Sequence, residues 1–285
     1  MPEGVALHHL ELLDQRAVAG LVAETRPDVI HHLAAQSSVA ASWKDPMRTL
    51  FENAVAQYNV LEAMLSSAPD ARMVVVGSCD EYGNVAREDN PVHERQELRP
   101  SSPYALSKVT QDLMGRQYAE LHGLAVVRLR PFLQIGPRRP DRFAAGSFAR
   151  QVAEIERGLR EPVIEVGNID LQRDFTDVRD VARAYALIAE RGQRGEVYNI
   201  ASGTAHSLRD LLEVMLQTAR VEAEIRVMPA LKRTGEAALL IGDADRLRTA
   251  TGWETRVSFE QSAADTLAYW QRRIQRMPAQ GRSTR

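Results

Sequence analysis

Short apolar runs alternate with longer amphipathic segments in the first half of the chain. Residues 73–76 form an uninterrupted apolar run that ends at Gly77, and residues 29–33 and 125–129 are runs rich in β-branched residues. Such runs are typical of strands that are buried on both faces of a parallel sheet. The sequence therefore predicts three strands at these places.

The segments between these runs carry apolar residues at helical spacing. We expect helices over 15–24, 45–65 and 102–122, the last of which starts at a Ser-Pro pair and stops at Gly123. Strands that alternate with helices indicate right-handed βαβ units. The predicted fold class is α/β, with a Rossmann-like, doubly wound parallel sheet.

The pattern changes after residue 140, where helical segments alternate with short strands. The expected helices and strands of this part cover 143–158, 163–166, 178–191, 196–200, 208–220 and 224–227. We expect a dinucleotide-binding domain over 1–140 with segments near 176–202. A smaller mixed α/β substrate-binding lobe is expected over 141–175 and 203–275, and the polar residues 276–285 predict a flexible tail.

Composition narrows the class of protein. The chain has 285 residues, a net charge of −2, 44% hydrophobic and 26% charged residues, which is ordinary for a globular protein. The near-neutral charge gives no electrostatic reason to expect nucleic acid or a membrane as partner. Cys79 is the only cysteine, so an intrachain disulfide and a cysteine-based zinc site are excluded, and a reducing cytoplasm is the default expectation. His31 and His32 have no metal-ligand partner at usable spacing, so we expect no metal.

The strongest local signal for chemistry is the spacing of Tyr104 and Lys108. On a helix, residues four apart lie on one face, so an ammonium group can lie near a phenol. Its charge should lower the pKa of the phenol from about 10 toward neutrality, and a phenol tuned in this way can exchange a proton with a carbonyl or alcohol oxygen. Taken alone, the pattern also fits a half-buried tyrosine beside a solvated lysine.

A serine upstream supports the catalytic interpretation. Ser78 directly follows the apolar run 73–76 and Gly77. A hydroxyl just beyond the carboxyl end of a central parallel strand lies where ligands bind in such sheets. Ser78 is therefore expected to hold the same oxygen that Tyr104 protonates.

Several motifs follow one another in the order of a known family. They are 32–39 with Ser42, Pro46 and Asn53; 78–83; Tyr104 with Lys108; 130–132 with 136–137; 167–168 with 173–181; and 197–203 with 252–253. On these motifs the chain resembles the extended short-chain dehydrogenase/reductases, in the NAD-dependent epimerase/dehydratase group that acts on nucleotide sugars.

Within that family the likeness is greatest to the GDP-mannose branch. It rests on residues 149–156, Pro162, 166–168 and 173–175. This branch contains GDP-6-deoxy-4-keto-D-mannose reductases and GDP-mannose 4,6-dehydratases. In both, an arginine and a glutamate of the late lobe bind the nucleotide, and the matching residues here are Arg233 and Glu236.

The resemblance implies NADP or NAD as cofactor and a GDP-linked sugar as substrate. The implied catalytic residues are Ser78, Tyr104, Lys108 and Asp80. Those implied for the cofactor are Leu33, Ala34, Ala35, Asn53, Tyr104, Lys108, Pro131 and Arg139, and those for the substrate are Asn168, Arg173, Arg233 and Glu236. The apolar faces of the helices expected at 45–65 and 102–122 are expected to pair in a homodimer or homotetramer.

The sequence departs from the family pattern in three ways. The glycine-rich dinucleotide loop is not found, and residues 10–14 look like the family's third strand, so we expect either a start recorded too late or a short form that binds cofactor poorly. Leu133 stands where asparagine is usual. Asp80 stands where dehydratases carry glutamate, which favours simple carbonyl reduction.

Three functions therefore stay open at this point. The preferred one is nicotinamide-dependent reduction of a 4-keto nucleotide sugar. A dehydratase that uses Asp80 with internal return of hydride is the alternative. The third possibility is a protein that binds nucleotide sugars with little or no turnover.

Overall fold

The computed structural model describes residues 4–231 and 237–276, and it divides into two compact units. The first unit comprises Met1–Gly83, Glu97–Arg130 and Tyr185–Tyr198, and the second comprises Asn84–Gln96, Pro131–Ala184 and Asn199–Arg285. The tail predicted at 276–285 lies outside the described residues, except for Arg276.

A four-stranded sheet forms the centre of the first unit. Its strands are β1 (Val29–His32), β2 (Arg72–Val76), β3 (Ala125–Pro131) and β7 (Val197–Ile200), in the order β1-β2-β3-β7. β1 pairs with β2 and β2 with β3 in parallel, with His32 opposite Val75 and Val76 opposite Leu129. The predicted strands are confirmed, and the carboxyl ends of β1, β2 and β3 meet at one edge of the sheet.

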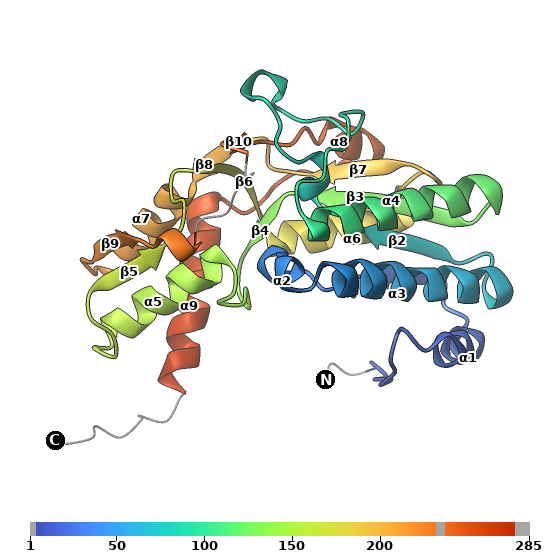
Figure 1. Ribbon diagram of the computed structural model, residues 1–285, viewed down its shortest axis with the longest axis horizontal. Helices are drawn as coiled ribbons and strands as arrows, with labels where there is room; N and C mark the ends of the chain where they lie inside the picture. Colours follow the sequence, from blue (N-terminus) through green and yellow to red (C-terminus); the bar gives the residue numbers. More distant parts are fainter. Residues whose placement is uncertain (1–3, 232–236, 277–285) are drawn as a thin grey trace. The chain divides into compact units, whose positions relative to one another are not determined.

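Four helices of the first unit start at side-chain caps. α1 (Gln15–Thr25), α2 (Val39–Lys44), α3 (Pro46–Ser67) and α4 (Pro103–Leu121) are capped by Asp14, Ser38, Asp45 and Ser102, which accept hydrogen bonds from backbone N–H groups of the first turn. α3 lies alongside α4 and also packs against α1 (Figure 1). Val22, Met64, Met73 and Val126 belong to the apolar core that these helices form with the sheet.

The prediction that residues 10–14 correspond to the family's third strand is wrong, because no strand forms there. The carbonyl oxygen of Leu12 instead accepts a hydrogen bond from the Asn59 side chain at 2.8 Å. The backbone N–H of Asp14 bonds to the carbonyl of Glu11, and its carboxylate caps α1. Leu12 packs against the core, so its apolar character reflects burial beside α3 instead of strand pairing.

The second unit is a mixed α/β assembly with shorter strands. β4 (Leu133–Ile135), β6 (Gln172–Asp177) and β10 (Leu239–Leu240) form a parallel sheet in the order β10-β6-β4, and β8 (Ala205–Ser207) pairs antiparallel with β6. β5 (Val163–Val166) pairs in parallel with β9 (Glu224–Val227). The strands β4, β6, β8 and β10 were not predicted.

Three helices cover the core of the second unit. α5 (Ala144–Glu156), α7 (Leu208–Ala219) and α9 (Phe259–Gln275) pack against one another around Phe148, Leu211 and Trp270. α6 (Val178–Arg191) has the bounds that the sequence predicted, whereas α2, α8 (Asp245–Thr251) and α9 were not predicted. Short 3₁₀ turns lie at Cys79–Tyr82, Arg87–Asp89 and Pro229–Leu231.

Membrane-spanning helices and metal clusters are both absent from the described residues. No helix among residues 4–231 and 237–276 is both long and apolar enough to cross a bilayer. The same part of the chain holds no group of three or more His, Cys, Asp or Glu residues that could bind a metal ion.

Candidate active site

The loop after β2 turns sharply because Gly77 leaves no room for a side chain. A Cβ at this position would lie 2.2 Å from Oε1 of Glu81 and 2.9 Å from the carbonyl oxygen of Leu129. The chain therefore passes close to β3 and then enters the 3₁₀ turn Cys79–Tyr82, whose N-cap is Ser78. Ser78 thus lies at the carboxyl edge of the sheet, where the sequence predicted it.

Tyr104 is brought to Ser78 by the start of α4. Pro103 occupies the first turn of this helix and Ser102 caps it, with its Oγ accepting a hydrogen bond from the N–H of Ala105 at 3.0 Å. The Tyr104 phenol lies beside the Ser78 side chain, whose interaction with the phenol lowers its pKa. Both residues are buried, each with 8% of its surface exposed. The structure therefore places the two predicted catalytic hydroxyls together.

Lys108 lies one helical turn after Tyr104 and points to the same end of β2. Its Nζ donates hydrogen bonds to the carbonyl oxygen of Val76 at 2.8 Å and to Oε1 of Gln111 at 2.9 Å. Burial lowers the pKa of Lys108 to about 8, and the charge of Glu81 opposes this shift. An ammonium carries three donors, and these two bonds use two of them.

The expected effect of Lys108 on the Tyr104 pKa is not what the structure shows. Burial raises the pKa of the Tyr104 phenol well above its usual range, and the negative charge of Asp80 raises it further, while the hydrogen bond with Ser78 lowers it. Desolvation is the largest cause because the phenol is almost fully buried. At neutral pH, Tyr104 is therefore a protonated donor.

A buried network of charged groups lies behind Ser78, and sequence reasoning missed it. Oε2 of Glu81 accepts a hydrogen bond from Nε of Arg130 at 3.0 Å, and the same nitrogen donates to Oδ2 of Asp112 at 3.0 Å. Asp112 also forms a buried ion pair with Arg128. Arg128 and Arg130 are two apart on β3, so they share one face of the strand. The sequence did contain a sign of this network, since Arg128 and Arg130 are two arginines inside an otherwise apolar strand.

Asn53 connects the segment after β1 to α4. Its Oδ1 accepts from the N–H of Gln36 at 2.7 Å, and its Nδ2 donates to the Gln36 carbonyl at 3.1 Å and to Oγ of Ser107 at 2.8 Å. Gln111 donates to the Asn53 carbonyl at 2.9 Å and lies 3.4 Å from Nε2 of His32. Burial lowers the pKa of His32 to about 4, so this histidine is neutral. These polar side chains hold α3, α4 and the β1 edge in register beside Lys108.

Comparison with known proteins decides the family. The family model described as GDP-mannose 4,6 dehydratase matches residues 1–266. The chain belongs to the GDP-mannose 4,6 dehydratase family. The predicted resemblance to the nucleotide-sugar epimerases and dehydratases of the extended short-chain dehydrogenase/reductase type is thereby confirmed.

Individual members of this family and of its fold are similar over nearly the whole chain. GDP-6-deoxy-D-mannose reductase of Pseudomonas aeruginosa is 37% identical over 267 residues, which cover 94% of this chain and 88% of that protein. The structure of RMD from Pseudomonas aeruginosa complexed with NADPH matches with a TM-score of 0.89 and 36% identity, covering 93% of this chain and 88% of that one. UDP-glucose 4-epimerase of Thermus thermophilus in complex with NAD matches with a TM-score of 0.85 and 28% identity, over 95% and 86% of the chains. The Rossmann-like fold class is confirmed.

The residues predicted for the cofactor occupy several places. Leu33, Ala34 and Ala35 directly follow β1, and Leu33 is exposed. Pro131 is the last residue of β3. The Arg139 guanidinium lies over the ring of Phe143, 3.9 Å from its centroid. Asn53 is engaged with protein groups, as described above. Their contacts with a cofactor stay predictions.

The residues predicted for the substrate lie in the second unit or outside the described part. Asn168 is exposed after β5. Arg173 is buried in β6, opposite His206 of β8, and its Nη1 donates to the carbonyl of Gln172 at 2.8 Å. Arg233 and Glu236 lie outside the described residues.

Proposed function

We propose that this protein catalyses the nicotinamide-dependent reduction of the 4-keto group of a GDP-linked 6-deoxy sugar, as GDP-6-deoxy-D-mannose reductase does. The observation that carries the proposal is that Ser78 and Tyr104 are buried beside each other, with Lys108 on the helix of Tyr104. The 37% identity to a GDP-6-deoxy-D-mannose reductase and the similarity to RMD complexed with NADPH support the substrate class and the cofactor.

Tyr104 and Ser78 have different roles in the reduction of the 4-keto group. A nicotinamide bound at this edge of the sheet would supply the hydride that the carbonyl carbon receives. Tyr104 is protonated because burial raises its pKa, so it donates its proton to the 4-keto oxygen and an alcohol results. Ser78 holds the same oxygen by a hydrogen bond. The tyrosinate left behind is reprotonated from solvent.

Lys108 fits the requirements of a nicotinamide cofactor. Its ammonium is held at the carboxyl end of β2, and one of its three donors remains for a ribose hydroxyl. Leu33, Ala34 and Ala35 follow β1 at the same edge of the sheet, where dinucleotides bind in such folds. We assign these residues, with Asn53, Pro131 and Arg139, to the cofactor, and Asn168, Arg173, Arg233 and Glu236 to the GDP-sugar.

The decisive experiment is a coupled measurement of cofactor and product. GDP-6-deoxy-4-keto-D-mannose with NADPH or NADH should give one oxidised cofactor for each molecule of reduced sugar, identified by mass spectrometry and NMR. Cofactor oxidation without a reduced sugar, or no turnover of the keto sugar with either cofactor, would overturn the proposal. The ratio of kcat/KM for the two cofactors decides between NADP and NAD.

A dehydratase is the second candidate. The matching family model carries the name of that activity, and several relatives are GDP-mannose 4,6-dehydratases, although at only 24% to 28% identity. In this reaction Asp80 would take part in the elimination of water, and hydride would return to the same sugar. Complete conversion of GDP-mannose with sub-stoichiometric NADP would favour it. Binding of GDP-sugars by calorimetry without any turnover would favour a catalytically silent protein.

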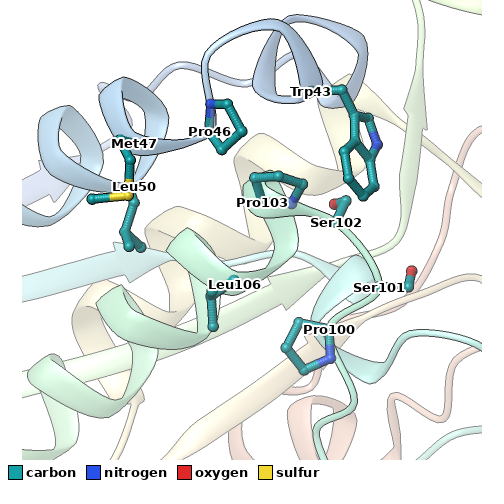
Figure 2. A pocket seen from close by; sticks show the side chains of 9 residues that line it. All are labelled: Trp43, Pro46, Met47, Leu50, Pro100, Ser101, Ser102, Pro103 and Leu106. Carbon is teal, nitrogen blue, oxygen red and sulfur yellow. The ribbon is translucent and has the colours of Figure 1, made fainter.

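We also propose that the protein forms a homodimer through α3 and α4. A groove of about 390 Å³ is lined by apolar side chains of α2, α3 and the start of α4 together with Pro100 and Ser101. Figure 2 shows these side chains. Trp43, Met47, Phe51, Leu106 and Leu113 are exposed along these helices, between 46% and 71%. An exposed apolar stripe of this extent is typical of an interface, and a second copy offers a matching stripe about a twofold axis.

The location we propose is the cytoplasm. Cys79 is the only thiol and is buried, which suits a reducing compartment.

A further inference from the structure

Glu81 is a buried acid in the turn that carries Ser78, and no role has so far been assigned to it. Its side chain has no solvent exposure. Oε1 accepts a hydrogen bond from the backbone N–H of Ser78 at 2.8 Å, and Oε2 accepts one from Nε of Arg130 at 3.0 Å. Burying a carboxyl group in this place is costly unless both oxygens have hydrogen-bond partners, and here both do.

The geometry connects Glu81 to the reacting hydroxyls through Ser78. The Glu81 bond fixes the peptide N–H of Ser78, and Oγ of Ser78 accepts from the N–H of Asp80 at 3.1 Å. The Ser78 hydroxyl then has its remaining hydrogen-bonding capacity for Tyr104. Gly77 is required at the start of this turn because the Glu81 carboxylate fills the space that a Cβ would take.

The far end of the Glu81 side chain is anchored by buried, hydrogen-bonded groups. Arg130 is buried and also donates to Oδ2 of Asp112 at 3.0 Å and to the hydroxyl of Tyr82 at 3.2 Å. Asp112 lies on α4, the helix that carries Tyr104 and Lys108. The network therefore ties the Ser78 turn to β3 and to the helix of the catalytic tyrosine.

We propose that Glu81 is a positioning residue for the reduction: anchored by Arg130, it holds the Ser78 turn so that the Ser78 hydroxyl meets Tyr104 and the substrate oxygen. This inference rests on the function proposed above. A valine or leucine in its place could fill the volume but could not accept the Ser78 N–H. Replacing Glu81 is therefore expected to lower kcat more than it changes KM, because Ser78 holds the substrate oxygen during the reaction step.

The first test compares Glu81→Met, which has no strong acceptor, with Glu81→Gln, which keeps one acceptor oxygen for the Ser78 N–H. We expect Glu81→Met to lower kcat by about tenfold or more with little change in KM, and Glu81→Gln to recover kcat to within about threefold of wild type. Tyr82→Phe is the matched control, since it removes one partner of Arg130 in the same network without touching Ser78. Equal kcat losses in Glu81→Met and Tyr82→Phe, or no recovery in Glu81→Gln, would overturn the proposal.

A double-mutant cycle with Ser78→Ala separates positioning from general damage. If Glu81 acts through Ser78, Glu81→Met should lower kcat by less than about twofold in the Ser78→Ala background. Effects that multiply would contradict it. Should Glu81→Met fail to fold, Glu81→Asp keeps a carboxyl group opposite Arg130 but is too short to reach both partners, and a wild-type kcat in that variant would count against the proposal.

A third readout needs no turnover and so separates this inference from the proposed reaction. Hydrogen exchange of the Ser78 amide, followed by NMR, should be at least about tenfold faster in Glu81→Met than in wild type and unchanged in Tyr82→Phe. An inactive wild-type protein would refute the reductase assignment alone. Unchanged Ser78 exchange in folded Glu81→Met would refute the role of Glu81, whatever the protein reduces.

Discussion

Tyr104 and Ser78 are buried beside each other, although Ser78 belongs to the turn after β2 and Tyr104 to the first turn of α4. Two helix-capping serines and one glycine bring the two side chains together. Ser102 starts α4 beside the sheet edge, Ser78 caps its own 3₁₀ turn, and Gly77 allows the chain to pass close to β3.

Removing the phenol hydroxyl tests the proposed proton donor. Tyr104→Phe should lower kcat by about 10²–10⁴-fold, because the alkoxide formed by hydride transfer then has no proton donor in place. Stability should change by only about 1 kcal/mol, the usual cost of one lost hydrogen bond. Stopped-flow measurement of hydride transfer and thermal unfolding check the two statements.

A second buried tyrosine provides the control for this prediction. The Tyr198 hydroxyl accepts a hydrogen bond from the N–H of Gln193 at 3.1 Å. Tyr198→Phe should therefore cost a similar amount of stability and leave kcat at the wild-type value. Wild-type turnover in Tyr104→Phe would remove the phenol from the mechanism.

The buried ammonium of Lys108 should make stability depend on pH in a defined direction. Burial lowers its folded-state pKa to about 8 from its ordinary value of 10.5, so between these values the unfolded chain holds a proton that the folded chain has lost. Stability therefore rises with pH across this window, by about 1.4 kcal/mol for each pH unit. Lys108→Met lacks this contribution.

The measurement is the difference in the free energy of unfolding between wild type and Lys108→Met. Above pH 9 the Glu81 carboxyl, whose pKa burial raises to about 8, is mostly ionised in wild type and contributes little further change. From pH 9 to 10.5 the wild type should gain about 2 kcal/mol relative to the variant in urea titrations. A constant difference would mean that Lys108 titrates at its ordinary pKa.

Sequence patterns were reliable wherever burial depended on neighbours along the chain. The strands β5 and β9 and the helix α6 have the predicted bounds, because apolar spacing alone determines which side of each element is buried. β6 was missed because Arg173, Asp174 and Asp177 make it look like a polar loop. Their burial depends on partners far along the chain, such as Ser202 and Ser262.

The same distinction separates the parts of the proposed active site. Ser78, Tyr104 and Lys108 could be found from spacing and from the strand that precedes them. Glu81 and Arg130 could not be paired in advance, because their contact depends on how β2 and β3 align. The direction of the Tyr104 pKa shift was likewise beyond the sequence, since it depends on how deeply α4 buries the phenol.

The proposed dimer predicts which surface substitutions will separate the subunits. Met47 and Phe51 are one turn apart on α3 and are 71% and 58% exposed. Met47→Glu with Phe51→Glu should give a monomer in light scattering, because the two copies would bring four carboxylates into an apolar contact. Leu159→Glu, at an exposed leucine of the second unit, is the control and should leave the mass unchanged. A monomeric wild type would refute the interface.

Asp174 in the second unit should be among the most sensitive positions for stability. Its carboxylate has no solvent exposure and accepts from the N–H and the hydroxyl of Ser202 at 2.7 and 2.6 Å, from the N–H of Gly203 at 2.8 Å and from the N–H of Gly242 at 3.2 Å. Asp174→Asn directs an amide donor at these donors, so the variant should lose about 3 kcal/mol of unfolding free energy.

Asp170→Asn is the control for Asp174→Asn, because it makes the same substitution at an exposed aspartate. Asp170 accepts from Arg209 at 2.8 Å, but both side chains are exposed, so its loss should change stability by less than about 1 kcal/mol. Urea denaturation of the two variants gives the comparison directly. If Asp174→Asn were no less stable than Asp170→Asn, the loops that contain Ser202 and Gly242 would not depend on this carboxylate. The arrangement of β6 against those loops would then have to come from apolar packing alone.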